Sequence, residues 1–164
     1  MLNNLILFNF NKNSNIKDWY IVNDGVMGGL SKGKIQLTDE GYGQFSGHVS
    51  LENNGGFTSV RHDFETVNIS EYSGFILEIK GDGNDFQFRV KSTQNQQYNY
   101  VCTFKTTGEW QTIKIPFSEM YPTYRGYRLR RQNFSGKQVA SMAFLIANKK
   151  EQDFSILIDN ISVE

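Results

Sequence analysis

The sequence feature that most constrains the fold is a period-two alternation of apolar and polar residues. In residues 86–91, Phe and Val alternate with Gln, Arg and Lys, and residues 75–80 keep apolar residues at every second position. Because successive side chains of a strand point to opposite faces, this pattern predicts strands with one buried and one solvated face. Residues 81–85 between them are all Gly, Asp or Asn, which predicts a hairpin joining the two strands.

The same rhythm recurs along the chain and predicts one all-β domain over residues 1–164. No window of eleven or more residues carries the 3.6-residue repeat of an amphipathic helix. The 13 Phe, 8 Tyr and 2 Trp residues supply bulky side chains for a core. Short strands separated by Gly, Asn and Ser are typical of an antiparallel β-sandwich or jelly roll. The further predicted strands are 35–38, 44–51, 57–64, 98–104, 110–115, 141–147 and 154–158, with 5–10 and 19–22 as weaker candidates.

Charge and cysteine content exclude several classes of protein. The 17 Lys and Arg residues balance 17 Asp and Glu residues, and this zero net charge argues against a general nucleic-acid-binding protein. Cys102 is the one cysteine, and with only His48 and His62 beside it the chain has no zinc motif. The apolar run 5–8 is too short for a signal peptide or a membrane-spanning helix. We therefore expect no metal, no cofactor, no stable membrane insertion and a cytoplasmic location.

Two segments interrupt the alternation in the first half of the chain. Residues 23–34 contain four glycines, but no helix and no Gly-Lys-Ser follow, so the pattern does not predict a phosphate-binding loop. The glycines are explained either by a turn that needs positive φ or by a loop that contacts a ligand or partner. Residues 52–56 predict a second hairpin turn, whose amides are alternatively placed to bind a sugar or a peptide backbone. The candidate contact residues in these segments are Asp24, Met27, Asn53 and Asn54.

The third irregular segment, residues 116–136, is predicted as a long loop with a net charge of +3. Four arginines face a single carboxylate, Glu119, and three tyrosines lie among them. Arginine and tyrosine are enriched at protein–protein hot spots, and their side chains also form cation–π contacts. Three interpretations stay open: a protein-docking surface, a structural flap over the sandwich edge, or a patch for an anionic ligand. The candidate contact residues are Tyr124, Arg125, Tyr127 and Arg128.

The sequence offers no catalytic constellation. His62 and Asp63 are neighbours in a predicted strand, so they point to opposite faces and cannot act as a base and its orienting group. Cys102 lies in an aromatic strand, where a buried apolar role is the simpler interpretation. We therefore expect a protein that is not an enzyme.

Several motifs, in order, resemble one known family. The motifs are Trp-Tyr-Ile-Val-Asn-Asp-Gly-Val-Met-Gly-Gly-Leu-Ser at 19–31, and the segments 45–61, 81–83, 110–117, 122–126 and 154–161. Together they resemble the complex I intermediate-associated protein 30 family, from about residue 6 to residue 163. The resemblance implies a galactose-binding-like β-sandwich, a fold shared with many carbohydrate-binding modules. It also implies a role in assembly, because the family's mitochondrial member binds intermediates of the respiratory NADH dehydrogenase without being an oxidoreductase.

Two hypotheses for the function follow. The first is a non-enzymatic domain that binds a protein partner, such as a respiratory-complex subunit or assembly intermediate, in a chaperone-like manner. The alternative is a carbohydrate-binding domain, because sugar sites combine aromatic faces with Asn, Asp and Arg hydrogen-bonding groups.

Overall fold

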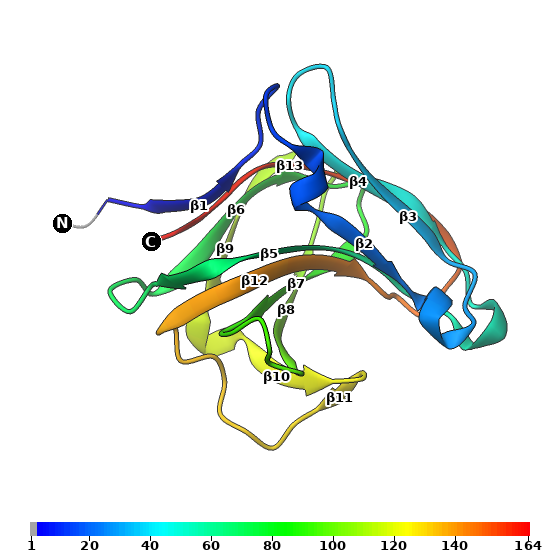
Figure 1. Ribbon diagram of the computed structural model, residues 1–164. Helices are drawn as coiled ribbons and strands as arrows, with labels where there is room; N and C mark the ends of the chain where they lie inside the picture. Colours follow the sequence, from blue (N-terminus) through cyan, green and yellow to red (C-terminus); the bar gives the residue numbers. More distant parts are fainter. Residues whose placement is uncertain (1–2) are drawn as a thin grey trace.

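Two antiparallel β-sheets pack face to face (Figure 1). The structure is a computed structural model that describes residues 3–164, except for the side chains of Val26 and Met27. Within the described residues, thirteen strands account for nearly all of the regular structure, with four single-turn 3-10 helices between them. The predicted antiparallel β-sandwich is confirmed.

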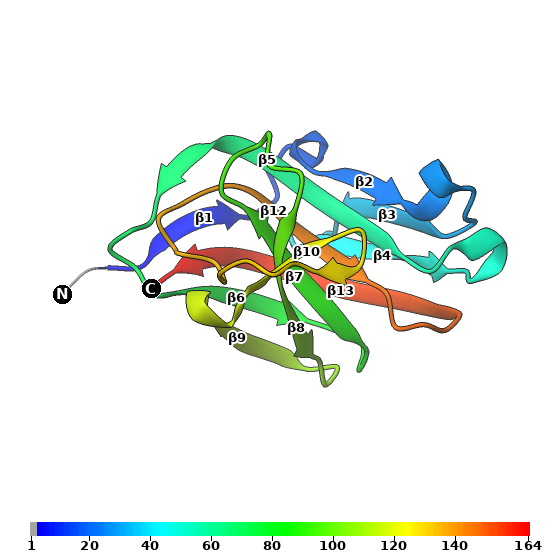
Figure 2. The same cartoon turned by 90° about the horizontal axis from the view of Figure 1, so that it is seen from below.

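The two sheets interleave along the sequence. The six-stranded sheet has the order β3-β4-β13-β6-β9, with β1 paired to β13 (Figure 2). Its strands are β1 (Leu5–Asn9), β3 (Lys32–Leu37), β4 (Gly43–Val49), β6 (Gly74–Lys80), β9 (Trp110–Pro116) and β13 (Gln152–Val163). The seven-stranded sheet has the order β11-β10-β8-β7-β12-β5-β2. Its strands are β2 (Tyr20–Asn23), β5 (Thr58–Asn68), β7 (Asp85–Lys91), β8 (Asn99–Lys105), β10 (Tyr121–Tyr124), β11 (Tyr127–Arg128) and β12 (Gln138–Ile146).

Aromatic side chains from both sheets fill the core. Phe75 of the six-stranded sheet meets Phe88 of the seven-stranded sheet with ring centroids 5.1 Å apart. Phe86 meets Phe154 at 6.3 Å in the same way. Burying each of these side chains contributes about 1.5–3 kcal/mol, so the alternation that predicted the strands also supplies the force that joins the sheets.

Both predicted hairpins are wrong in their pairing. The 81–85 turn joins β6 in one sheet to β7 in the other, and the 52–56 connection likewise joins β4 to β5 across the sandwich. Alternation specifies which face of a strand is buried, but not which strand lies beside it. Since both flanking strands bury aromatic faces, they pack face to face across the core instead of pairing edge to edge.

The predicted long loop 116–136 is wrong in part, because residues 121–124 and 127–128 within it form paired strands. It begins with a 3-10 turn, η4 (Phe117–Glu119), and continues into the paired strands β10 and β11. The segment that returns to β12 is held by Phe134, which is buried against Phe75 and Phe117. The strands escaped prediction because Pro122 and the solvent-exposed tyrosines obscure the alternation.

The seven-stranded sheet is curved, with β2 and the 3-10 turn η2 (Asp24–Met27) toward one end of the curve and β10–β11 at the other (Figure 1). We call the face turned away from the six-stranded sheet the outer face. No helix in residues 3–164 is long and apolar enough to cross a membrane.

Candidate functional site

A row of side chains crosses the outer face of the seven-stranded sheet. Residues that lie directly opposite each other on neighbouring strands share a face, so the register defines the row. Arg61 of β5 and Arg89 of β7 are both register partners of Ala143 in β12, which places this small residue between the two arginines. In order across the sheet, the row is Tyr20, Arg61, Ala143, Arg89, Val101 and Tyr121. We call it the arginine row.

Hydrogen bonds connect the arginine row to the polar residues of the adjacent row. Arg61 donates from Nη1 to Ser141 Oγ and from Nη2 to Asn99 Oδ1, both at 2.6 Å. The Ser141 hydroxyl in turn donates to Asp63 Oδ1 at 2.6 Å. Tyr20 donates its hydroxyl to the other oxygen of Asp63, also at 2.6 Å. One continuous network therefore runs from β2 across β5 and β12 to β8.

The contact between Arg61 and Asn99 agrees with a concave outer face. Strands β12 and β7 lie between β5 and β8. Adjacent strands are about 4.8 Å apart, so a flat sheet would separate β5 from β8 by roughly 14 Å. Fully extended Arg and Asn side chains would only just cover that distance, so the 2.6 Å hydrogen bond fits the curved sheet seen in Figure 1.

Burial and mutual proximity shift the pKa values on this face. Burial, together with the nearby charge of Arg61, lowers the pKa of Arg89 to about 10. Burial also lowers the pKa of Arg61, and burial with the charges of the two arginines lowers the pKa of Lys91. Burial and the hydrogen bond to Asp63 raise the pKa of Tyr20 to about 12. The outer face therefore holds several positive charges in a partly dehydrated environment.

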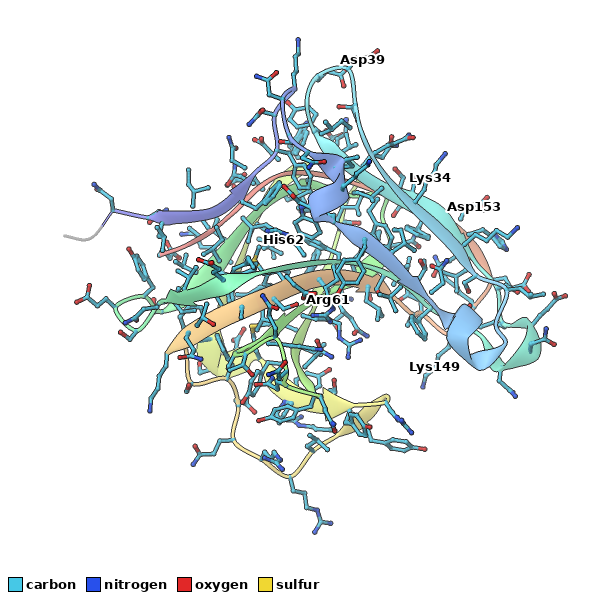
Figure 3. The ribbon with its side chains drawn as sticks, viewed as in Figure 1. Lys34, Asp39, Arg61, His62, Lys149 and Asp153 are labelled. Atoms are coloured by element: carbon cyan, nitrogen blue, oxygen red, sulfur yellow. The ribbon has the colours of Figure 1, made fainter. Side chains whose placement is uncertain are left out.

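His62 belongs to the opposite side of β5. Figure 3 shows Arg61 and His62 pointing away from each other across the strand. The His62 ring stacks on Trp19 at 5.2 Å, and its Nδ1 lies 2.9 Å from the carbonyl oxygen of Asp18. Asp63 lies with the outer-face network, as the strand alternation predicts, so the two residues do not pair.

The glycine-rich loop is organised by one buried carboxylate. Asp24 accepts hydrogen bonds from the backbone N–H and hydroxyl of Ser31, at 3.0 and 2.6 Å, and from the N–H groups of Gly56 and Phe57, at 2.7 and 3.3 Å. Burial raises the pKa of Asp24, but these hydrogen bonds outweigh it and hold the pKa below its ordinary value. Asp24 thus joins the 24–31 loop to the 52–57 connection.

The glycines around Asp24 leave space for its side chain. A Cβ atom at Gly29 or Gly55 would collide with the Asp24 carboxylate. Gly28 ends η2 in the left-handed conformation, with φ of 88°, which glycine adopts at little cost. Close packing against the buried carboxylate therefore accounts for Gly29 and Gly55, and backbone conformation accounts for Gly28, whereas a Cβ atom at Gly25 would meet no atom within 4 Å.

Strands β10 and β11 form a hairpin with a two-residue turn, and we call residues 121–128 the tyrosine hairpin. Tyr124 pairs with Tyr127, and Arg125 and Gly126 between them have φ of 50° and 83°. Positive φ at both central residues matches the type I′ turn that suits the twist of paired strands. The Arg125 guanidinium lies 5.2 Å from the centre of the Tyr124 ring, and that of Arg128 lies 4.6 Å from the centre of the Tyr121 ring.

The residues predicted as contacts form two separate groups. Asp24, Asn53 and Asn54 come together where the two loops meet, and both asparagines are exposed with positive φ. The side chain of Met27 lies outside the described residues. Tyr124, Arg125, Tyr127 and Arg128 lie in the tyrosine hairpin, at the sheet edge opposite to β2.

The arginine row between these groups was missed by the sequence analysis. Alternation places Arg89 and Lys91 on a solvated face, but only the strand order shows that Arg61 lies two strands away on the same face. The described residues contain no group of three or more His, Cys, Asp or Glu residues arranged to hold a metal ion.

The fold belongs to the same class as solved carbohydrate-binding modules. A family 11 carbohydrate-binding module from Clostridium thermocellum, solved with a β-1,3-1,4-mixed-linked tetrasaccharide, matches with a TM-score of 0.69 and 22% identity, covering 98% of this chain and 94% of that chain. A family 30 carbohydrate-binding module matches with a TM-score of 0.58 and 15% identity, covering 99% of both chains. At these identities the likeness establishes the fold alone.

The chain belongs to the complex I intermediate-associated protein 30 family, whose family model matches residues 8–158. The mitochondrial complex I intermediate-associated protein 30 of Drosophila melanogaster is 25% identical over 184 residues, which cover 97% of this chain and 62% of the relative. The Mus musculus protein of the same name is 22% identical and is covered to 55% of its length, against 96% of this chain. The chain therefore spans little more than half the length of these relatives.

These relatives contradict the expected cytoplasmic location, because both are named as mitochondrial proteins. The expectation rested on the first residues of the sequence, which are no evidence of location.

Proposed function

We propose that this chain is a non-enzymatic, chaperone-like protein-binding domain that engages an intermediate in the assembly of respiratory complex I. The observation that carries the proposal is the exposure of aromatic side chains on an ordered hairpin. The Tyr127 side chain is 77% exposed at the turn, and Tyr124 beside it is 38% exposed. Family membership supports an assembly role, since the relatives are named for association with complex I intermediates.

The physics of recognition favours this hairpin as a contact surface. Tyrosine buries a large area at low cost in conformational entropy, and arginine adds hydrogen bonds around it. The type I′ turn and the pairing with β8 hold the hairpin in place before a partner arrives, which lowers the entropy lost on binding. Arg125 and Arg128, each over a tyrosine ring, are proposed as the polar contacts around the aromatic anchors.

The connection at residues 52–56, which we call the asparagine loop, is proposed as a second contact. Asn53 and Asn54 are exposed, and Leu30 and Leu51 expose apolar side chains in the segments that Asp24 joins. This loop leads into β5, next to the edge strand β2, whereas the tyrosine hairpin forms the opposite edge of the same sheet, so a partner that lies across the outer face would reach both.

Capture of complex I subunits tests the proposal. Tagged wild-type protein, recovered from its host cells, is expected to enrich complex I subunits quantified by mass spectrometry. Tyr124→Ala/Tyr127→Ala is expected to lower that enrichment about tenfold or more, since losing two aromatic anchors costs at least 1–2 kcal/mol of binding.

The matched control is Trp110→Ala. Trp110 is 42% exposed on β9 of the six-stranded sheet, so this change removes an exposed aromatic ring away from the hairpin. The control is expected to enrich the same subunits as the wild type. The proposal fails if the wild type enriches no complex I subunit, or if the tyrosine variant retains them all.

A second candidate function is carbohydrate binding, favoured by the position of Tyr20 on the concave outer face. Tyr20 is 43% exposed, and its hydroxyl donates to Asp63, which Ser141 links to Arg61. If this function is correct, a β-1,3-1,4-mixed-linked glucan oligosaccharide will raise the thermal unfolding midpoint by several degrees, and Tyr20→Ala will abolish the rise. An unchanged midpoint for the wild type at millimolar oligosaccharide excludes this candidate.

A further inference from the structure

Three half-buried cations on the outer face form no ion pair with a described carboxylate. Within the described residues, no carboxylate oxygen lies within 4.0 Å of the charged nitrogens of Arg61, Arg89 or Lys91. Among the described residues, the close contacts between basic and acidic side chains are His48 Nδ1 with Asp153 and Lys114 with Glu164, and both lie away from the outer face. Removing a charge from water is costly unless it is paired, so three neighbouring cations without a partner are an unusual feature of a neutral chain.

Most N–H groups of these three cationic side chains donate to no described residue. Arg61 donates to the neutral acceptors Ser141 and Asn99. Arg89 donates one hydrogen bond, from Nη2 to Thr123 Oγ1 at 3.1 Å, and its buried Nε has no acceptor among the described residues. The Lys91 ammonium group donates no hydrogen bond to a described residue, although the backbone of Lys91 pairs with that of Ser141.

Asp63 is the carboxylate whose charge acts on Arg61 and Lys91, raising the pKa of each against the stronger effect of burial. Asp63 accepts the hydroxyls of Tyr20 and Ser141, one on each oxygen. One oxygen is therefore held toward β2 and the other toward β12, and neither forms an ion pair with Arg61, Arg89 or Lys91. At this part of the face, Arg61, Arg89 and Lys91 thus outnumber the single carboxylate of Asp63.

The geometry of the row suits a planar anion. Ala143 between the two arginines adds no bulk, and the Cα atoms of Arg61 and Arg89 lie two strand spacings, or about 10 Å, apart. A guanidinium group presents its N–H donors in a fork that matches the two oxygens of a carboxylate. The lowered pKa values of Arg89 and Lys91 are consistent with cations that gain from an added anion.

We propose that the outer face, at Arg61, Arg89 and Lys91, binds carboxylate side chains of an acidic segment in the protein partner. This inference rests on the proposed protein-binding function, to which it adds the chemistry of the partner. A neutral sugar would leave the three charges without a counter-ion. A nucleic acid would need a broad basic surface, whereas the rest of this chain offsets the positive charge of the face.

Binding of a defined acidic peptide tests the inference on the full chain. The probes are fluorescein-labelled, N-acetylated octaglutamate and octaglutamine, measured by fluorescence anisotropy at low salt. We expect octaglutamate to bind at least tenfold more tightly than octaglutamine, with an affinity that falls as salt is added. Arg89→Gln and Lys91→Gln are each expected to weaken octaglutamate binding about fivefold to tenfold.

Two controls separate loss of charge from loss of structure. Lys34→Gln removes an exposed charge from β3 of the six-stranded sheet, and is expected to change the affinity less than twofold. Lys91→Gln removes a side chain with no hydrogen bond to the described residues, so its thermal unfolding midpoint is expected to stay at the wild-type value. Equal binding of the two peptides, or octaglutamate binding that Arg89→Gln and Lys91→Gln both leave unchanged, overturns the inference. An oligothymidylate of eight nucleotides that binds as tightly as octaglutamate also overturns the inference, because the face would then accept any polyanion.

The peptide-binding measurement and the capture of complex I subunits test the two proposals independently. Octaglutamate binding that depends on Arg89 and Lys91, with no complex I subunit captured, overturns the proposed partner and supports the acidic-segment site. Capture that depends on Tyr124 and Tyr127, with no preference for octaglutamate, overturns the site and supports the proposed function.

Discussion

Phe134→Ala is expected to lower the free energy of unfolding by about 3–5 kcal/mol, the usual cost of removing a buried phenylalanine ring. Phe134 is buried against the rings of Phe75, Tyr100 and Phe117, at centroid distances of 5.9, 5.1 and 5.2 Å. It belongs to the segment between β11 and β12, so its loss opens a cavity beneath the tyrosine hairpin. Urea unfolding followed by tryptophan fluorescence measures the effect as a lower midpoint.

The matched control for Phe134 is Gln132→Ala. Gln132 is exposed in the same segment, and its truncation is expected to change the free energy of unfolding by less than about 0.5 kcal/mol. A loss below about 1 kcal/mol for Phe134→Ala would contradict the packing described here, because it would mean that the segment does not depend on this ring.

Asp24→Asn is expected to cost about 3 kcal/mol of stability at neutral pH. Each Asp24 oxygen accepts at least one backbone N–H: that of Ser31 on Oδ1, and those of Gly56 and Phe57 on Oδ2. An asparagine places an NH₂ group at one of these positions in either orientation. At least one buried N–H then loses its acceptor, which costs about 1–3 kcal/mol in addition to the lost charge-assisted hydrogen bonds. Urea unfolding at pH 7 measures the difference.

The cost of Asp24→Asn is also expected to depend on pH. The folded-state pKa of Asp24 lies below its ordinary value, so the charged group contributes stability above the unfolded pKa, about 3.9. That contribution disappears as the pH falls through the folded-state pKa. The difference in free energy of unfolding between the wild type and Asp24→Asn will therefore narrow below about pH 4. Asp39→Asn, which alters an exposed carboxylate between β3 and β4, is the control and should show little effect at neutral pH. A gap that stayed constant between pH 7 and pH 3 would argue against a charged Asp24 in the folded protein.

The sequence predicted the faces of the strands more successfully than their partners. Residues 86–91 show the alternation, and the structure buries Phe86, Phe88 and Val90 as expected. Which strands pair depends on long-range packing, such as that of Phe75 on Phe88, and no local pattern encodes it. Alternation was therefore enough to predict the sandwich. It was not enough to predict that the strands on either side of residues 81–85 and of residues 52–56 belong to different sheets.

The same limit explains why the arginine row was not predicted. Arg61, Ala143 and Arg89 are far apart in sequence, and the row exists only because β12 lies between β5 and β7. The tyrosine hairpin was recognised as a candidate because its chemistry is contiguous in the chain. Clustered sequence chemistry is visible without a fold, whereas chemistry assembled across a sheet requires the strand order.

At Arg125, the stability of the turn and the proposed recognition of a partner favour different residues. With φ of 50°, this arginine occupies a left-handed conformation that costs a side-chain-bearing residue about 1–2 kcal/mol, and that glycine or asparagine would adopt more readily. A chain optimised only for a durable turn would carry one of those residues there. The guanidinium over the Tyr124 ring is thus maintained at the expense of the hairpin's own stability. Variants selected for heat resistance should drift away from arginine at this position, and variants selected for partner recognition should keep it.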